Sequence, residues 1–339
     1  MSNINRQWLL KRRPTGPVVR EDFEYREDPA PTADTLADGG LILRNKAFLC
    51  APTMRNWMEA PGNSLYPSIP IGSAIMAPAV CEVVASRRDD VPVGTRVMAI
   101  TSWQDFQQVD TSHDVTPIPD WMGDVDALGL YGINGVTAYI GITRIGRPKA
   151  GETVVVSGAA GSTGVTAAQV AKALGCRVIG IAGGKRKCDW LIEEIGLDGA
   201  VDYRAGDVQG QLAQLCPQGI DVFYDNVGGE ILQAAIENMA VFGRIVLCGQ
   251  IASYNDDGPV PGPTNMMRLI YGNIRMEGFL CLAYADVFPE AREKLREWKE
   301  AGRMIHREDV RPGFEKLPET YNALFDGSNS GTLIGIVEE

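Results

Sequence analysis

Histidine is scarce in this 339-residue chain, and its seven cysteines are scattered. His113 and His306 are the two histidines, no C-x-x-C pair occurs, and the cysteine count is odd. A disulfide framework, a structural zinc knuckle and a catalytic zinc site each need a compact set of such residues. The sequence therefore argues against all three, and buried, inert thiols are the simplest interpretation of the cysteines.

An excess of positive charge and a long apolar run are also missing. The formal net charge is −11, which argues against binding to nucleic acid or to an anionic membrane surface. No apolar run reaches the length of about 18 residues that a transmembrane helix needs, and the N-terminus lacks a signal-peptide pattern. We therefore expect a cytoplasmic protein, and the length indicates two domains around a large core.

The most informative stretch runs from Thr153 to Lys187. Thr153–Ser157 is a short β-branched run that predicts a buried strand, and 165–174 has the apolar spacing of a helix. A second apolar strand is expected at 177–181. Strand, turn, helix and strand form a βαβ unit, which implies a parallel sheet.

The turn inside this unit carries Gly158, Gly161 and Gly164, in the spacing G-x-x-G-x-x-G. Small residues at such a turn let the backbone approach a pyrophosphate at the N-terminus of the following helix, where N–H groups and the helix dipole favour negative charge. A purely structural glycine turn is the alternative, since glycine turns are common. The strand and helix on either side favour dinucleotide binding.

The end of the second strand indicates which dinucleotide binds. An NAD site usually places an acidic residue there to bond the ribose 2′-hydroxyl, whereas this chain has Gly183 and Gly184 followed by Lys185, Arg186 and Lys187. Three cations at the start of a helix oppose the helix dipole, and a 2′-phosphate would offset that cost. The sequence favours NADP(H) as the cofactor, the alternative being a solvated basic face.

The first 125 residues do not resemble a nucleotide-binding domain. Frequent Pro and Gly separate short apolar runs at 41–47, 79–85 and 96–100, which predict strands of an antiparallel, barrel-like domain. An irregular stretch from Cys50 to Pro70 is rich in Pro, Met and aromatic residues. It either lines an apolar pocket or packs as a loop on the core.

After the βαβ unit the alternation of strands and helices continues. Further strands are expected at 200–203, 221–225, 244–248 and 274–280, with helices at 208–215, 231–239 and 288–301 between or after them. This pattern predicts a doubly wound sheet, whose ligands bind beyond the carboxyl ends of the strands. The polar or small residues at those ends are therefore expected to face the cofactor, and they are Tyr203, Asn226–Gly229 and Gly249-Gln250.

Two C-terminal features complete the organisation. The stretch 251–273 is expected to be a long loop of the kind that is often functional. The last elements, an amphipathic segment at 317–325 and a strand at 333–337, are expected to return to the first domain.

Several motifs together resemble one family. GAAGSTG, AGGKRK, YDNVGG, LCGQIASYN, MEGF and GSNSGTL are similar to the zinc-independent medium-chain dehydrogenase/reductase superfamily. Within it they resemble the NADPH-dependent alkenal/one (double-bond) reductases, a group that includes leukotriene B4 12-hydroxydehydrogenase/prostaglandin reductase and curcumin reductase. The likeness extends from Pro14 to Val337.

The resemblance implies an α/β fold with a GroES-like, β-barrel-type catalytic domain and a doubly wound Rossmann domain. The expected bounds are 1–125 with 302–339 for the catalytic domain and 126–301 for the NADP(H)-binding domain, usually in a homodimer joined through the Rossmann sheets. The resemblance also implies cofactor-binding roles for matching positions. These are Gly161, Ser162, Thr163 and Gly164 at the pyrophosphate; Gly183, Lys187 and Tyr203 near the 2′-phosphate; Asn226, Cys248, Gly249, Ile251 and Tyr254 along the cofactor; and Phe279, Leu280 and Asn329 at the nicotinamide.

The chain departs from the family near the substrate. Family members often carry Asp-Pro-Tyr-Met-Arg, where this chain has Ala51-Pro52-Thr53-Met54-Arg55. An acidic group and an aromatic ring are thus missing from the expected pocket edge, which implies a different substrate. Arg55 and Tyr66 are the candidates for the substrate pocket, and no metal ligands are expected.

These observations predict a conjugate reduction. NADPH would give a hydride to the β-carbon of an α,β-unsaturated aldehyde or ketone, and Tyr254 is the candidate catalytic residue because it could donate a hydrogen bond to the enolate oxygen. The alternatives are an NADPH:quinone reductase of the same superfamily, a zinc alcohol dehydrogenase, and an NADPH-binding sensor or structural protein without catalysis. No nucleic acid or membrane partner is expected.

Overall fold

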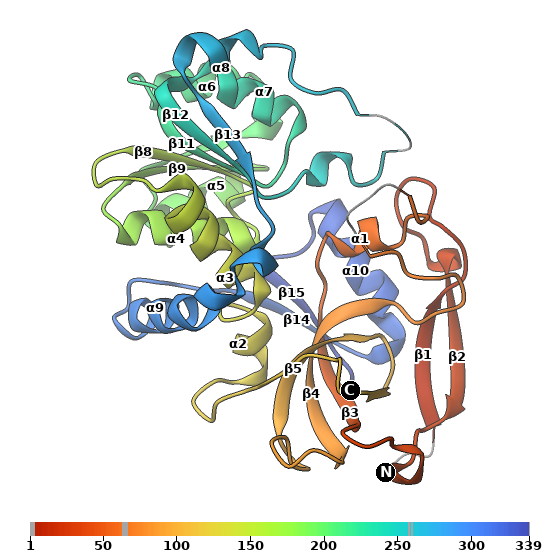
Figure 1. The fold of residues 1–339 in the computed structure, drawn as a ribbon. Helices are drawn as coiled ribbons and strands as arrows, with labels where there is room; N and C mark the ends of the chain where they lie inside the picture. The colour runs from red at the N-terminus through yellow and green to blue at the C-terminus, as the bar shows by residue number, and fades with distance from the viewer. Residues whose placement is uncertain (1–3, 63–66, 257, 259, 339) are drawn as a thin grey trace. The chain divides into compact units, whose positions relative to one another are not determined.

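The computed structural model describes residues 4–62, 67–256, 258 and 260–338 (Figure 1). The chain divides into two compact units. Unit 1 comprises Met1–Leu128 and Glu308–Glu339, and unit 2 comprises Gly129–Arg307. Each unit has its own sheet, so each is described by itself.

Unit 2 is built on a six-stranded sheet in the order β10-β9-β8-β11-β12-β13. All five neighbouring pairs are parallel. The strands are β8 (Thr153–Ser157), β9 (Arg177–Ala182), β10 (Gly199–Asp202), β11 (Ile220–Asp225), β12 (Met239–Leu247) and β13 (Arg275–Gly278). Numbered along the chain from β8, this order is 3-2-1-4-5-6, the Rossmann arrangement. The predicted doubly wound sheet is confirmed.

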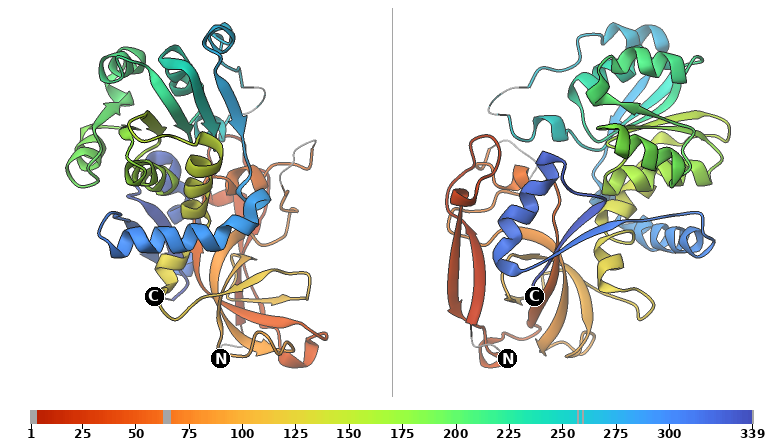
Figure 2. Two further views of the ribbon diagram at one scale, coloured as in Figure 1. Left: turned by 60° about the vertical axis from the view of Figure 1, so that its left-hand side comes forward. Right: turned by 180° about the vertical axis from the view of Figure 1, so that it is seen from behind.

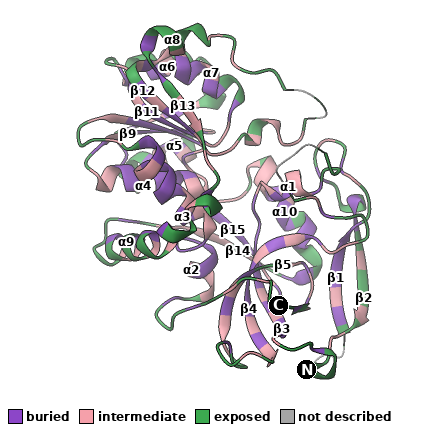
Figure 3. Ribbon diagram, viewed as in Figure 1, coloured by how far each residue is buried: buried purple, intermediate pink, exposed green. Residues whose placement is uncertain are grey.

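Helices cover both faces of this sheet (Figure 2). On one face, Leu212 of α6 (Val208–Leu215) and the apolar residues of α7 (Gly229–Glu237) share a core with Ile179 and Ile181 of β9. Side chains alternate along a strand, so Gly180 faces the other way, towards Leu191 of α5 (Lys185–Glu193). Helix α4 (Ser162–Ala173) packs against β8 and β9. Because both faces are covered, β8 reads as a continuous apolar run, and it is buried along most of its length (Figure 3).

Unit 1 is dominated by a seven-stranded sheet with the path β14-β15-β3-β4-β5-β7, and β6 pairs with β3. Its strands are β3 (Leu41–Leu49), β4 (Met76–Ser86), β5 (Arg96–Ser102), β6 (Phe106–Val109), β7 (Val115–Pro117), β14 (Glu308–Pro312) and β15 (Thr332–Ile336). Every pair is antiparallel except β14–β15. Because β15 pairs with β3, the expected return of the C-terminal elements to the first domain is confirmed.

Several elements were not predicted from the sequence. The stretch 251–273 is not loop throughout, because α8 occupies Met267–Gly272. Its exposed Met267, Ile270 and Tyr271 hid the helical spacing, since no buried apolar face marks it. The hairpin of β1 (Ile4–Leu10) and β2 (Phe23–Pro29) was not anticipated, because the charged residues of β2 weaken the apolar alternation of that strand.

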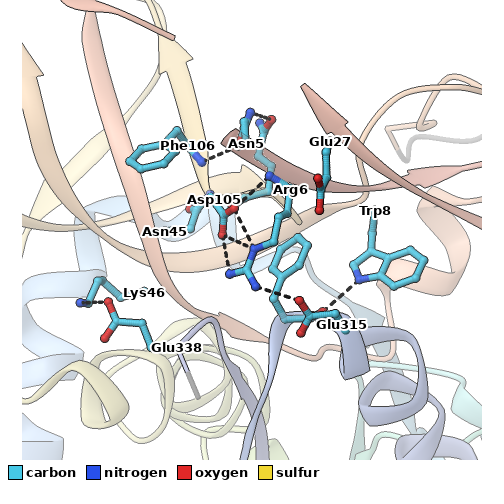
Figure 4. A network of polar contacts seen from close by, with 12 residues as sticks. Asn5, Arg6, Trp8, Glu27, Asn45, Lys46, Asp105, Phe106, Glu315 and Glu338 are labelled. Carbon is cyan, nitrogen blue, oxygen red and sulfur yellow. Dashed lines mark hydrogen bonds and ion pairs between the residues drawn. The ribbon is translucent and has the colours of Figure 1, made fainter. Parts of the chain in front are cut away.

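Polar contacts join this hairpin to the rest of unit 1 (Figure 4). Arg6 donates from Nε and Nη2 to Asp105, which immediately precedes β6, and from Nη1 to Glu315 at 2.9 Å. Trp8 Nε1 donates to the carbonyl of Phe314 at 2.9 Å. These contacts hold the hairpin against the segment before β6 and against the segment that contains Phe314 and Glu315.

Five further helices complete the described part of the chain. They are α1 (Met54–Trp57), α2 (Asp124–Leu128), α3 (Ile133–Ile140), α9 (Phe288–Glu300) and α10 (Leu317–Asp326). None of the helices in the described residues is both long enough and apolar enough to cross a bilayer.

Candidate functional site

The glycine turn lies between β8 and α4, as expected, but the helix starts earlier than predicted. Gly161 is the N-cap and α4 begins at Ser162, so Ser162, Thr163 and Gly164 form its first turn. A Cβ atom at Gly164 would lie 2.2 Å from the carbonyl oxygen of Gly158, a distance at which the backbone must move. The N-cap has no side chain to occupy the N–H groups of this turn, which favours an anionic ligand there.

At the end of β9, the three cations have different surroundings. Lys185 is 86% exposed in its side chain and pairs with Asp189 at 2.7 Å. Lys187 is half-buried one residue before Cys188, which packs inward. The structure therefore distinguishes two lysines that the sequence presented as one cluster.

Tyr203 follows β10 and lies against the turn after β9. A Cβ atom at Gly183 would lie 2.7 Å from the Tyr203 hydroxyl oxygen and 2.8 Å from its ring, so glycine is the residue that fits there. The Asp202 carboxylate accepts the N–H groups of Gly184 at 2.7 Å and Arg204 at 2.9 Å. This carboxylate holds Tyr203 beside the start of α5, where Lys187 lies.

Asn226 follows β11. Its amide Nδ2 donates to the carbonyl of Ser157 at 2.7 Å, and its backbone N–H donates to the Ser157 hydroxyl at 2.8 Å. Asn226 is thereby fixed beside the start of the glycine turn, where a Cβ atom at Gly158 would lie 3.5 Å from the Asn226 Cβ.

The turn after β12 carries four of the predicted residues. The N–H groups of Cys248 and Gly249 donate to the carbonyl of Asp225 at 2.8 and 3.1 Å. The Tyr254 hydroxyl accepts the N–H of Gln250 at 3.3 Å, so the phenol folds back over the turn that precedes it. Ile251 begins a short 3₁₀ turn, Ile251–Ser253. Burial raises the pKa of the Cys248 thiol to about 12, so this thiol is neutral at pH 7 and unsuited to act as a nucleophile.

Phe279 and Leu280 directly follow β13, the last strand of the sheet. Phe279 is half-buried and Leu280 is 63% exposed. All predicted cofactor-binding residues of unit 2 thus lie at the carboxyl ends of its parallel strands or in the segments that follow them.

The remaining predicted residues belong to unit 1. The Asn329 amide donates to the carbonyl of Gly331 at 3.2 Å. The Arg55 side chain is fully buried, pairs with Glu59, and donates to the carbonyls of Pro14 and Gly16. Tyr66 lies outside the described residues. The roles of these three residues stay predictions, although the geometry of Arg55 also explains it as an internal brace.

The sequence analysis missed three polar residues that support the turns of the predicted cofactor site. Asp202 ends β10 and accepts the N–H groups of Gly184, in the turn after β9, and of Arg204. Asp225 ends β11 and accepts the N–H groups of Val227 and Gly228. Asn134, near the start of α3, donates to the Ser162 hydroxyl at 3.1 Å. An acidic residue as the last residue of a buried strand was the available signal for both aspartates.

These residues fit a dinucleotide with a 2′-phosphate. Gly164 and Gly183 let the backbone pack closely against Gly158 and Tyr203, where a Cβ atom would collide. The start of α4 has no side-chain cap, and Lys187 and Tyr203 lie at adjacent strand ends. Gly161, Ser162, Thr163 and Gly164 would hold the pyrophosphate, and Lys187 and Tyr203 the 2′-phosphate. No group of three or more His, Cys, Asp or Glu side chains within the described ranges is arranged to hold a metal ion.

Comparison with known families assigns the same two parts of the chain. Residues 6–118 match a family described as the N-terminal domain of oxidoreductase, and residues 162–297 match one described as zinc-binding dehydrogenase. The NADPH-dependent curcumin reductase of Escherichia coli (strain K12) is 35% identical over 342 residues, covering 97% of this chain and 96% of that protein. A 2-alkenal reductase (NADP(+)-dependent) of Nicotiana tabacum is 34% identical and covers 98% of this chain and 97% of its own length.

A solved structure agrees over the whole fold. CurA of Vibrio vulnificus in complex with NADPH is 34% identical, with a TM-score of 0.91 and coverage of 98% of this chain and 99% of that one. Identity above 30% over nearly the full length, together with the Rossmann sheet and its glycine turn, establishes the family. The chain belongs to the medium-chain dehydrogenase/reductase superfamily, within which it is an NADP(H)-dependent oxidoreductase.

Proposed function

We propose that this protein reduces the carbon–carbon double bond of α,β-unsaturated aldehydes and ketones. Bound NADPH supplies the hydride, which goes to the β-carbon of the substrate. The position of Tyr254, in the turn that follows β12 beside the predicted cofactor edge, is the observation that carries the proposal. The two relatives, a curcumin reductase and a 2-alkenal reductase, support the same substrate class.

Tyr254 would act on the charge that develops in this reaction. Hydride addition at the β-carbon places negative charge on the carbonyl oxygen, and a hydrogen-bond donor aimed at that oxygen lowers the barrier. A phenol with the ordinary pKa of about 10 keeps its proton at pH 7 and so can donate it. The Gln250 N–H donates to the Tyr254 oxygen at 3.3 Å, which orients the hydroxyl.

A substrate panel tests the proposal. NADPH oxidation is followed optically with enals, cyclic enones, aryl enones and quinones at matched concentrations. We expect kcat/KM to be highest for an enal or enone, with a product saturated at the former double bond. Higher kcat/KM for quinones would establish the quinone reductase alternative, and NADPH binding without turnover of any compound would establish a non-catalytic protein.

Replacing Tyr254 tests the residue itself. We expect Tyr254→Phe to lower kcat by roughly 100- to 1,000-fold, the range for removing one donor from an oxyanion site, with little change in NADPH affinity. Titration of NADPH by protein fluorescence supplies the affinity. Unchanged kcat in the variant would remove Tyr254 from the mechanism and leave the ribose 2′-hydroxyl as the donor.

We also propose that the chain pairs with a second copy through the sheet of unit 2. Strand β13 is an edge strand within the described residues, and an unpaired edge is a template for another strand. Exposed apolar side chains follow it in sequence, with Leu280 at 63% and Leu282 at 62%. Light scattering at micromolar concentration should give a dimer, and a monomer there would refute the pairing.

A further inference from the structure

Strand β11 carries two aspartates four residues apart, and each ties β11 to β8. Near the amino end of the strand, the Asp221 Oδ2 accepts the N–H of Thr153 at 2.8 Å. At the carboxyl end, the Asp225 Oδ1 accepts the hydroxyl proton of Ser157 at 2.7 Å. The two aspartates therefore join the same two strands at opposite ends. The predicted cofactor-binding residues gather at the carboxyl end.

Asp225 makes several contacts beyond this tie. Its side chain also accepts the N–H of Val227 at 3.0 Å and the N–H of Gly228 at 3.1 Å to each oxygen. Its backbone carbonyl accepts the N–H groups of Cys248 and Gly249. Asp225 is completely buried, so these donors take the place of water.

Through these contacts Asp225 bonds to three of the segments that are expected to bind the cofactor. Through Ser157 it reaches the strand end that leads into the glycine turn, because Ser157 also accepts the N–H of Asn226. Through Val227 and Gly228 it shapes the turn that carries Asn226 and begins α7. Through its carbonyl it anchors the start of the turn that leads to Tyr254.

Hydrogen bonds partly offset the cost of burying a carboxylate at this position. Burial raises the pKa of the Asp225 carboxyl, and the Ser157 hydroxyl and the N–H groups of Gly228 and Val227 oppose that shift. The carboxylate also lies directly before the N-terminus of α7, where the helix dipole favours negative charge. Removing it would leave the Ser157, Val227 and Gly228 donors without their acceptor in a buried place, which is costly.

We propose that Asp225 is a positioning residue for the nicotinamide and pyrophosphate half of NADP(H). It acts through the turns that it holds, and it leaves the adenosine half to Lys187 and Tyr203, which lie at the ends of β9 and β10. This proposal rests on NADP(H) binding and is independent of the substrate class.

The test compares Asp225→Asn with Asp221→Asn. An asparagine at 225 keeps one acceptor oxygen but sets an amide donor against the Gly228 N–H, whereas an asparagine at 221 disturbs the opposite edge. Calorimetry on the intact protein, without substrate, measures the Kd of NADPH and of 2′,5′-ADP, a probe of the adenosine half. Thermal unfolding of the same samples measures stability.

We expect Asp225→Asn to weaken NADPH roughly 10- to 100-fold, as the loss of buried hydrogen bonds to a charged group implies, and to change 2′,5′-ADP affinity less than about threefold. Asp221→Asn should lower Tm and leave the ratio of the NADPH and 2′,5′-ADP dissociation constants unchanged. Equal weakening of both ligands by Asp225→Asn, or no weakening, would reduce Asp225 to a structural residue and overturn the proposal.

Ser157→Ala keeps the test decisive if Asp225→Asn does not fold. This variant removes one donor to Asp225 and retains the carboxylate with its backbone contacts. It should weaken NADPH several-fold with the same sparing of 2′,5′-ADP. An unchanged ratio of the two dissociation constants in Ser157→Ala would contradict the positioning role. Failure of the enone proposal would appear in the substrate panel and would leave these binding results unaffected.

Discussion

Two sets of polar side chains, one in each unit, have different roles. In unit 1, Arg6 forms ion pairs with Asp105 and Glu315. The fully buried Arg55 pairs with Glu59 and donates hydrogen bonds to two backbone carbonyls. In unit 2, Asp202 and Asp225 accept backbone N–H groups and so shape the turns beyond the strands. The first set stabilises the fold of unit 1. The second set shapes the turns that are expected to bind the cofactor.

A change in the glycine turn should have the largest effect. Gly164→Val would place a branched side chain where even a Cβ atom lies 2.2 Å from the Gly158 carbonyl oxygen. We expect NADPH affinity to fall by about 100-fold, because overpacking against the backbone costs about 3 kcal/mol. Calorimetry measures the loss.

Gly161→Ala is the matched control for that variant, because its Cβ atom would lie 3.3 Å from the same oxygen and a small shift would relieve the contact. The control should lose much less affinity than Gly164→Val. Equal affinity for NADPH in Gly164→Val and the parent would mean that the turn does not approach the cofactor.

Arg55 offers the corresponding test in unit 1. Arg55→Met would remove the charge and leave the carbonyls of Pro14 and Gly16 without a donor, so the free energy of unfolding should fall by about 2–4 kcal/mol. NADPH affinity should stay at the parent value below the unfolding transition. Chemical denaturation and NADPH titration give the two quantities.

The same variant separates the two roles of Arg55. A raised KM for an enone with unchanged stability would favour the substrate-pocket prediction over the internal brace. Glu59→Gln is the control, because Glu59 is 53% exposed in its side chain and its replacement leaves the backbone contacts of Arg55 in place.

Lys187 should have a smaller and more selective effect. Lys187→Gln removes a charge expected to face the 2′-phosphate, so NADPH affinity should fall by about tenfold or more, with NADH affinity unchanged. Lys185→Gln is the control, because Lys185 is exposed and already paired with Asp189. Parallel titrations with NADPH and NADH measure the two affinities in each variant. If NADH bound to the parent as tightly as NADPH, and Lys187→Gln changed neither, the electrostatic basis of the NADP(H) assignment would fail.

The smallest expected effect lies in unit 1 and depends on pH. Hydrogen bonding to Arg311 lowers the pKa of Asp309 below its ordinary value of 3.8, with burial opposing. The carboxylate therefore stabilises the fold at pH values above about 4, and this contribution is lost as the pH falls through the lowered pKa.

Asp309→Asn should accordingly cost under about 1 kcal/mol at pH 7, because the pair is partly exposed, and less at pH 3. Urea denaturation at both pH values measures the difference. A cost that is the same at pH 3 and pH 7 would show that the charge of Asp309 does not contribute. Asp34→Asn is a suitable control, since Asp34 is exposed and the described part of the chain shows no ion pair for it.

The success of the sequence analysis differed between elements for physical reasons. Strands β8 and β9 were predictable because they are apolar runs covered on both faces, and helix α4 between them shows regular apolar spacing. Helix α8 and strand β2 were missed because exposed apolar or charged residues interrupt the pattern that burial imposes. The turns expected to face the cofactor were predicted from local signals, namely glycines and the residues at strand ends.

By itself, the sequence determined the Rossmann unit, the glycine turn and the preference for a 2′-phosphate, because each depends on residues that are close together along the chain. Only the tertiary structure decided which polar groups act on one another across long separations. It paired Asp225 with Ser157 and Asp221 with Thr153, 68 residues apart in each case, and it buried Arg55 against Pro14 and Gly16. Such pairings follow from strand order and packing, which no local pattern specifies.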